Sequence, residues 1–338
     1  MKLKYLATTV ALTAFAQAQV YSDVVGFVKL GSQTGDSVAA NTDVTISIPF
    51  VNPAEGIYTV SSWTFDTTVD NLGGTVTLNE TLTAGAFDAP TSGAPYMIEV
   101  SSGTDEGIFL EVASNTASTL TLTGYGTEFL SGLAADDTIT VRQAWTLGTF
   151  FPTDLPNGTT VYTYDSDGIN SSAAQQYQIY SGVWYSIADG SNVTDLIIYP
   201  GESFILRSPA DTAIPELYAT GVTTVTNSRT VLRKNSTAPQ DTRCSYHSPV
   251  SETLSECGLS DIASNGDIIY IYDNSVPGIN KSASLQYSYY EGNWYNLADG
   301  ALSNDVTLTG GAGFIYRRND TGSNDTYVSD SQNYRPNL

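Results

Sequence analysis

The sequence predicts an all-β protein built from tandem β-sandwich or small β-barrel modules with an internal duplication. Short segments rich in β-branched and aromatic residues recur along the chain, separated by clusters of Gly, Asn, Asp, Pro and Ser, which is typical of strands and turns. No window longer than about ten residues keeps a 3.6-residue apolar period, so the helical crossovers of a parallel sheet are not expected. One long block of sequence also returns in the same order, which indicates a duplicated folding unit.

The N-terminus has the features of a signal peptide. A basic start, MKLK, precedes the apolar run YLATTVALTAFA, and Ala16-Gln17-Ala18 supplies the small-x-small pattern that signal peptidase cleaves. A membrane anchor is the weaker interpretation, because a spanning helix needs roughly 20 apolar residues and no segment supplies them. We therefore expect residues 1–18 to be removed. The mature chain, from Gln19, would be extracellular or at the cell surface, with the periplasm as the alternative.

The chain is strongly acidic: its 338 residues include 35 Asp and Glu against 13 Lys and Arg, a formal net charge of −22. Such a charge repels nucleic acids and anionic membrane surfaces, so neither is an expected partner. Apolar residues make up 41% of the chain, which favours folded cores over a disordered acidic chain. The acidity also fits cation binding, although the solubility of the surface explains it more simply.

An N-terminal β domain is expected over residues 19–138, and a small barrel-like insertion is expected inside it, around residues 94–126. The strand-like segments are residues 24–30, 43–50, 75–84, 94–100, 107–113, 119–126 and 137–145. The first of them, VVGFVKL, would be a strand close to the mature N-terminus. We expect this strand to join a neighbouring molecule, because a strand at a sheet edge can pair between chains.

The second half of the chain contains the duplication. VYTYD at residues 161–165 returns as IYIYD at residues 269–273, at a spacing of 108. The following turn is two residues longer in the second copy, and the spacing then stays at 110 as far as Arg207 and Arg317. A run of strand, turn, hairpin and strand in one register is a repeated folding unit.

The duplication divides the remainder of the chain into three parts. Two related β modules are expected at residues 139–219 and 220–319. A polar tail is expected at residues 320–338.

Each module carries an aromatic hairpin, SGVWYSIADG in the first copy and EGNWYNLADG in the second. Strand alternation places Trp184 and Tyr185 on opposite faces, and likewise Trp294 and Tyr295, so one ring of each pair is expected in the core and the other partly exposed. Exposed rings could stack on sugar faces, which makes these four residues the candidate polysaccharide-binding aromatics. Aromatic packing within the hairpin is the default interpretation.

The two cysteines of the chain, Cys244 and Cys257, are predicted to form a disulfide. Closing so short a loop would stabilise an exported protein by about 3 kcal/mol in the chain-entropy model. A zinc site is the alternative, but His247 is the single histidine of the chain and a further oxygen ligand would be needed.

The single histidine of the chain also limits which catalytic mechanisms are possible. Ser-His-Asp or Cys-His catalysis would have to use His247, and the chain has no GxSxG turn to present a nucleophile. We therefore expect no enzyme of these classes. Carboxylate chemistry of the glycosidase type stays open, because sequence does not show which acidic residues lie close together.

Residues 165–170 resemble half of a calcium loop, with oxygen ligands on Asp165, Asp167 and Asn170 and a glycine at the bend. The second copy loses this spacing, and no glutamate stands at the twelfth position of the first. An Asx-type turn is therefore favoured over calcium, and no other cofactor is expected.

The order of segments carries a resemblance. VGFV near the mature N-terminus, WTLGTFFP at residues 145–152 and GINKSAS at residues 278–284 are its most specific blocks. Over nearly the whole mature chain the sequence resembles an uncharacterised family of secreted proteins that occurs as multiple paralogues in verrucomicrobial bacteria. The resemblance implies an exported bacterial protein and assigns no catalytic residues. The chain departs from the family pattern at residues 243–257, where the two cysteines lie.

Two classes of function remain. The first is a structural or interaction protein, a subunit of a cell surface, extracellular matrix or filament, whose partners are further copies of itself or other cell-surface proteins. The alternative is an extracellular polysaccharide-binding module, and a carboxylate-dependent enzyme acting on glycans is a third choice.

Overall fold

The computed structural model confirms the all-β fold class. It describes residues 25–31, 38–65, 73–123, 132–164, 168–170, 173–232, 238–248, 250–319 and 325–329. The predicted signal peptide lies outside these residues. The described chain forms a closed barrel, two five-stranded sheets and three two-stranded sheets.

The first five-stranded sheet, the sheet of module 1, has the order β11-β10-β9-β12-β2 and is antiparallel throughout. Its strands are β2 (Asp43–Ser47), β9 (Thr160–Thr163), β10 (Gln175–Tyr180), β11 (Val183–Ser186) and β12 (Ser203–Arg207). The one-turn helix α1 (Leu147–Phe150) precedes β9, and its N-cap Thr146 forms a reciprocal capping box with Thr149.

The second five-stranded sheet, the sheet of module 2, has the order β15-β21-β17-β18-β19. Its strands are β15 (Gln240–Ser245), β17 (Ile268–Ile271), β18 (Leu285–Tyr290), β19 (Asn293–Asn296) and β21 (Gly313–Arg318). The short elements beside it are α2 (Leu259–Ile262), β16 (Glu252–Thr253) paired with β20 (Thr307–Leu308), and β14 (Ser228–Leu232) paired with β22 (Asp325–Ser329).

The two orders are the same when read from β2 and from β15, so the duplication extends to all five strands of each sheet. Strand β2 is the counterpart of β15, although it lies within the predicted N-terminal domain and pairs with β12. Module 1 is therefore discontinuous in sequence: the barrel is inserted between β2 and β9.

The barrel closes in the order β3-β4-β7-β6-β5-β8. Its strands are β3 (Ala54–Phe65), β4 (Gly74–Leu78), β5 (Tyr96–Val100), β6 (Phe109–Asn115), β7 (Thr119–Thr123) and β8 (Thr138–Gln143). Alternate side chains fill the interior, as in GTVTL of β4, where Gly74, Val76 and Leu78 are buried. The barrel thus covers more of the chain than the insertion expected around residues 94–126, and β8 crosses the expected domain boundary at residue 138.

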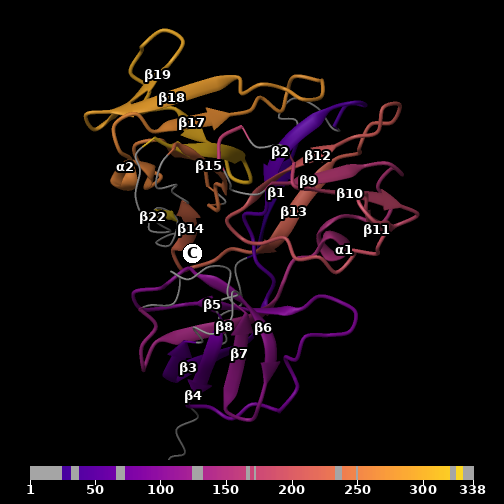
Figure 1. Ribbon diagram of the computed structural model, residues 1–338, viewed down its shortest axis with the longest axis vertical. Coiled ribbons are helices and arrows are strands. Elements are labelled where there is room, and N and C mark those ends of the chain that lie inside the picture. The colour runs from indigo at the N-terminus through magenta and orange to yellow at the C-terminus, as the bar shows by residue number, and fades with distance from the viewer. Residues whose placement is uncertain are drawn as a thin grey trace, which may run out of the picture.

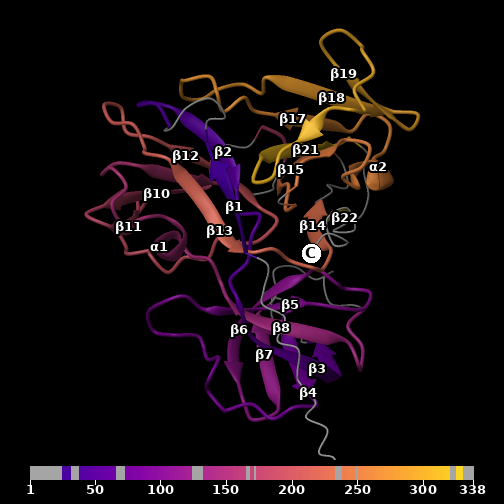
Figure 2. The same ribbon diagram turned by 180° about the vertical axis from the view of Figure 1, so that it is seen from behind.

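The residues that the structure describes accordingly form three apolar cores, one in each sheet module and one in the barrel. The barrel lies below both sheets in Figure 1, with module 1 beside module 2 above it, and the view from behind in Figure 2 shows the same arrangement. The helices of the described residues, α1 and α2, are four residues each, and neither could cross a membrane.

A further pair of strands, β1 (Val25–Leu30) and β13 (Leu217–Val222), connects the N-terminal segment with the end of module 1. Gly26, Val28 and Leu30 face the protein. The side chains of Val25 and Phe27 face outward and are 70% and 73% exposed.

The cysteine prediction requires a correction. Cys244 and Cys257 are not joined to each other in the structure, and both are fully buried in the core of module 2. Cys244 lies within β15 and directs its thiol to the carbonyl oxygen of Thr242, whereas the thiol of Cys257 faces the carbonyl oxygen of Leu254. Each thiol fills the core as a small apolar group, and burial raises the pKa of Cys244.

Candidate functional site

The two modules meet through contacts that are made twice, once in each direction. The N–H of Ser47 in β2 donates to the carbonyl oxygen of Gly311 at 3.1 Å. The N–H of Ser245 in β15 donates to the carbonyl oxygen of Gly201 at 2.9 Å. Since Gly201 and Gly311 are equivalent positions of the repeat, as are β2 and β15, the two modules are related by a pseudo-two-fold axis.

The glycine–asparagine turn of each module reaches across this axis to an aspartate of the other module. Asn280 donates its backbone N–H to Oδ2 of Asp43 at 2.7 Å, and Asn170 donates its N–H to Oδ2 of Asp241 at 2.8 Å. Both asparagines have a positive φ, 52° and 53°, and each stands two residues after a glycine that also has a positive φ. These turns require residues that tolerate the left-handed region, which explains why the same pair stands in both copies.

Each aspartate also binds an arginine of its own module. Arg207 donates from Nε to Oδ1 of Asp43 at 2.6 Å and from Nη2 to Oδ2 at 2.8 Å. Arg317 binds Asp241 in the same fork, at 2.6 and 2.9 Å. Hydrogen bonding to the aspartate raises the pKa of each arginine, so both remain charged.

The asparagine side chains complete the arrangement. Arg207 donates to Oδ1 of Asn280 at 2.9 Å, and Arg317 donates to Oδ1 of Asn170 at the same distance. We call the two sets of Asp, Arg and Asn the inter-module contact. Asn170, a candidate calcium ligand in the sequence, therefore has its side-chain oxygen occupied by a guanidinium, while Asp165 and Asp167 lie outside the described residues.

A cleft of about 610 Å³ opens beside this contact. We call it the inter-module cleft, because β2, β9 and β12 of module 1 line it together with β15 and the 272–281 segment of module 2. Its lining is polar: Asp43, Thr45, Tyr162, Tyr164, Asn170, Ala173, Gln176, Ile205, Arg207, Arg243, Tyr272, Asn280 and Lys281. Clefts of this size between structural units are the usual location of small-molecule sites.

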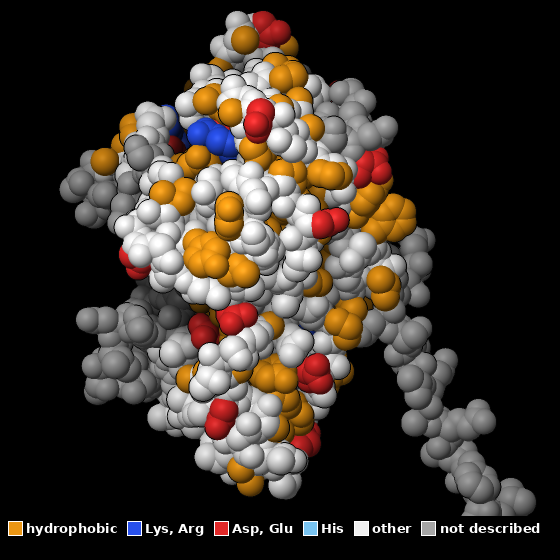
Figure 3. All heavy atoms as spheres, turned by 90° about the vertical axis from the view of Figure 1, so that its right-hand side faces the viewer, with side chains coloured by type: hydrophobic (Ala, Val, Ile, Leu, Met, Phe, Trp, Pro, Cys, Tyr) orange, Lys and Arg blue, Asp and Glu red, His pale blue; other side chains and the backbone are white. Residues whose placement is uncertain are grey.

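The cleft gathers positive charge in an acidic protein. Arg207, Arg243 and Lys281 are three of the 13 Lys and Arg residues of the chain, and Asp43 is the one carboxylate among the lining residues. By contrast, the face shown in Figure 3 is mainly acidic: Asp and Glu side chains are dispersed over it, and few Lys or Arg side chains are visible. The cleft is therefore suited to an anion.

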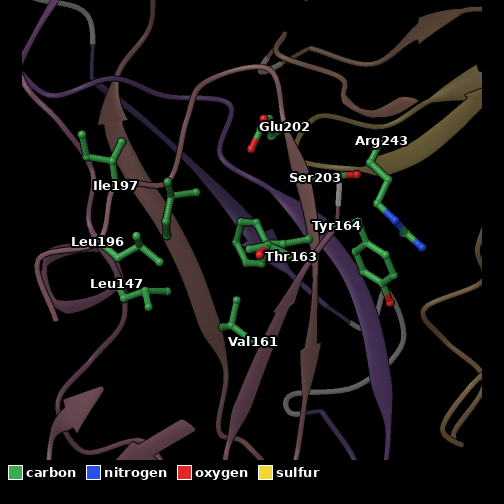
Figure 4. Close-up of a pocket in the computed structure, with 11 residues that line it drawn as sticks. Leu147, Val161, Thr163, Tyr164, Leu196, Ile197, Glu202, Ser203 and Arg243 are labelled. Carbon is green, nitrogen blue, oxygen red and sulfur yellow. The ribbon is translucent and has the colours of Figure 1, made fainter. Parts of the chain in front are cut away.

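Among the three cations that line the cleft, Arg243 is the one whose charge is least balanced by neighbouring groups. Its guanidinium carbon lies 3.5 Å from the centroid of the Tyr164 ring, and Nη1 is buried without a hydrogen-bond partner. Figure 4 shows the guanidinium beside that ring, at the rim of a smaller cavity of about 40 Å³. Leu147, Leu196 and Ile197 lie on the opposite side of this cavity, so its far wall is apolar.

Lys281 is held in place by backbone carbonyl groups. Its Nζ donates to the carbonyl oxygens of Asp273 and Val276 at 2.8 and 2.9 Å. Burial lowers the pKa of Lys281, and the nearby Asp273 and Asp43 oppose this effect. An additional anion near Nζ would stabilise the charged form further.

The candidate aromatics of the sequence lie elsewhere. Trp184 and Trp294 are 1% and 0% exposed, so both are core residues, as the alternation of the hairpin allows. Tyr185 is 37% exposed and Tyr295 is half-buried, and neither lines the cleft. The structure therefore does not bring these four residues together into one site.

Of the cleft residues, sequence reasoning singled out Asn170, as a calcium ligand, and did not identify the others as a site, although a signal was present. The two tyrosines of VYTYD recur in IYIYD, and Arg207 recurs as Arg317, so polar residues are repeated beside the apolar ones. Arg243 and Lys281 carry no such signal, because the first copy has Thr45 and Ser171 at those positions.

The zinc and catalytic alternatives both depended on His247, which is 2% exposed and lies edge-to-face with Phe109 of the barrel at 6.3 Å. Within the described residues there is no group of three or more His, Cys, Asp or Glu side chains that could hold a metal ion. His247 occupies the junction between the barrel and module 2.

The burial of His247 predicts a pH dependence of stability. Burial lowers the pKa of His247 to about 4, whereas an unfolded histidine has a pKa near 6.5. Between these values the unfolded chain binds a proton that the folded protein excludes, so the free energy of unfolding falls as the pH drops from about 6.5 to 4, by up to about 3 kcal/mol. Urea denaturation of the wild type and of His247→Phe across this range measures the effect. The free energy of unfolding of the variant should depend less on pH in this range than that of the wild type. An equal pH dependence of both proteins would contradict the prediction.

No family model, no curated protein and no solved structure matches this chain.

Proposed function

We propose that this protein is an exported structural or interaction protein, a subunit of a cell-surface layer, extracellular matrix or filament, and that it associates with further copies of itself through β1. The signal-peptide pattern of residues 1–18 and the resemblance to secreted verrucomicrobial proteins support export. The exposed apolar side chains of β1 are the observation on which the proposal rests.

Val25 and Phe27 are the two most exposed large apolar side chains among the described residues. Phe27 packs edge-to-face against Tyr218 of β13, whose own side chain is 42% exposed, with ring centroids 6.3 Å apart. Beside them Lys29 binds Glu216 at 2.7 Å. The outer face of β1 and β13 is thus an apolar surface bordered by an ion pair, which is the composition of an association surface.

The edge of β1 suits a second copy of the same strand. In the described part of the chain, β1 forms a ladder with β13 alone, so its other edge can accept a strand. If two copies of β1 pair antiparallel about a two-fold axis, their Val25 and Phe27 side chains lie on one continuous face. The net charge of −22 opposes the approach of two copies, so added salt should strengthen the association.

The variant Phe27→Lys should remain monomeric at concentrations at which the wild type associates. A lysine at this position replaces the most exposed large apolar side chain of the described residues by a charge that would have to be desolvated in the pair. Sedimentation velocity over a range of concentrations, with negative-stain electron microscopy, measures the difference. Ile57→Lys is the matched control, because Ile57 is 65% exposed but lies on β3 of the barrel. A monomeric wild type, or equal association of Phe27→Lys and wild type, would refute the proposal.

Binding of extracellular polysaccharide is the second candidate function. The inter-module cleft favours it, since this site combines hydrogen-bonding side chains with cations. The four hairpin aromatics do not contribute to the cleft.

A further inference from the structure

We propose that the inter-module cleft binds an acidic saccharide, a short oligosaccharide that contains uronic acid, and that Arg243 and Lys281 receive its carboxylate. This inference rests on the second candidate function, polysaccharide binding, and is independent of assembly through β1, because the two sites lie on different elements and neither requires the other.

The charge of the cleft favours a carboxylate. Arg207 is already bound by Asp43 in a two-pronged ion pair, so these two charges compensate each other. Arg243 forms no ion pair with any residue in the ranges that the structure describes. A guanidinium held flat against a tyrosine ring can still present N–H groups at its edge, the geometry that binds a carboxylate with two hydrogen bonds.

The remaining lining favours a saccharide over a simple anion. The hydroxyl-bearing Tyr162, Tyr164 and Tyr272 and the amide of Gln176 surround the cations. Such groups both donate and accept hydrogen bonds, as sugar hydroxyls do. A volume of about 610 Å³ also exceeds what one inorganic anion needs and lies within the usual range for small organic ligands.

The pseudo-symmetry of the fold does not extend to these charges. Arg243 of β15 replaces Thr45 of β2, and Lys281 replaces Ser171, so the two cations proposed to bind the carboxylate both come from the second copy of the repeat. Thr45 is instead held through its backbone by Asn274, whose side chain donates to its carbonyl oxygen and accepts from its N–H, both at 2.8 Å. The duplication has therefore produced two scaffolds but one charged site.

Isothermal titration calorimetry of the purified full-length protein with trigalacturonate tests the site. The methyl ester of the same trisaccharide keeps the hydroxyl groups and removes the charge, so we expect it to bind at least tenfold more weakly. Arg243→Gln should weaken trigalacturonate binding at least tenfold, because a charge-assisted pair is lost. Arg243→Lys should retain part of the affinity, and Lys281→Gln should cause a smaller loss.

Three controls separate the possible outcomes. Lys29→Gln removes a cation of β1 that is not in the cleft and should bind as the wild type does. Inorganic sulfate should compete weakly, and equal affinity for sulfate and trigalacturonate would refute saccharide recognition. The Phe27→Lys variant should bind normally, so that failure of assembly and failure of binding are seen separately. Equal binding of the acid and its ester by the wild type would overturn the proposal, whether or not Arg243→Gln folds.

Discussion

Replacement of Asp267 by alanine is expected to lower the free energy of unfolding by about 3–5 kcal/mol, because it leaves a buried cation without its counter-charge. Asp267 is fully buried, and Nε of Arg318, itself 1% exposed, lies 3.6 Å from its Oδ2. Its carboxylate also accepts hydrogen bonds from the hydroxyl of Tyr316 at 2.9 Å and from the backbone N–H groups of Asn319 and Ser264 at 2.8 and 3.0 Å.

The first copy of the repeat supplies the control for this prediction. Thr159 stands where module 2 has Asp267, and Ser208 stands where it has Arg318, so module 1 has no such ion pair. The double variant Asp267→Thr with Arg318→Ser should therefore cost less than Asp267→Ala alone, since no charge is left unpaired. Urea denaturation measures both. A double variant that is less stable than Asp267→Ala would show that the loss does not arise from Arg318.

The variants Asp43→Ala and Asp241→Ala are each expected to lower the free energy of unfolding by about 2–4 kcal/mol. Each removes the carboxylate that binds an arginine of its own module and the turn of the other. The expected loss is below that of a fully buried pair, because the side chains of Arg207 and Arg317 are 24% and 16% exposed and water can reach them.

The pseudo-two-fold axis makes this second prediction sharper. The two single variants should lose similar amounts, since their contacts are equivalent. The double variant should lose less than the sum, because both variants disrupt one interface. Asp211→Ala, at an exposed aspartate that bonds its neighbour Thr212, is the control and should be neutral within about 0.5 kcal/mol. Strictly additive losses would show that the two halves of the inter-module contact are independent.

The sequence was sufficient for the fold class and for the repeat from β9 to β12, because alternation and repeated spacing are local properties. The sequence did not show that β2 belongs to the sheet of module 1. The barrel separates β2 from the rest of its module, and DVTIS and the matching stretch DTRCS of β15 share the residue type at the first and last positions alone. Asp43 and Asp241, the first of these two identities, are the residues that hold the modules together, so the identity was informative but too short to recognise.

The site was harder to predict than the fold for a physical reason. The cleft residues come from six separate segments, and their proximity depends on the pairing of β2 with β12 and on the turn at residues 278–280. The disulfide prediction failed for a related reason, because loop length gives the entropy of closing a ring and says nothing about where two thiols point. Alternation predicted that one ring of each hairpin pair is buried without showing which one, and in the structure the buried rings are Trp184 and Trp294.

The inter-module contact makes this chain the covalent counterpart of an isologous dimer. In a dimer of separate subunits, residue i contacts j and j contacts i, and the stability depends on the concentration of subunits. Here the same reciprocity joins two halves of one polypeptide, so dilution cannot separate them. Because the two modules are encoded separately within one chain, their sequences can also differ. One module can have Arg243 and Lys281 while the other has Thr45, a difference that a homodimer encoded by a single gene cannot have.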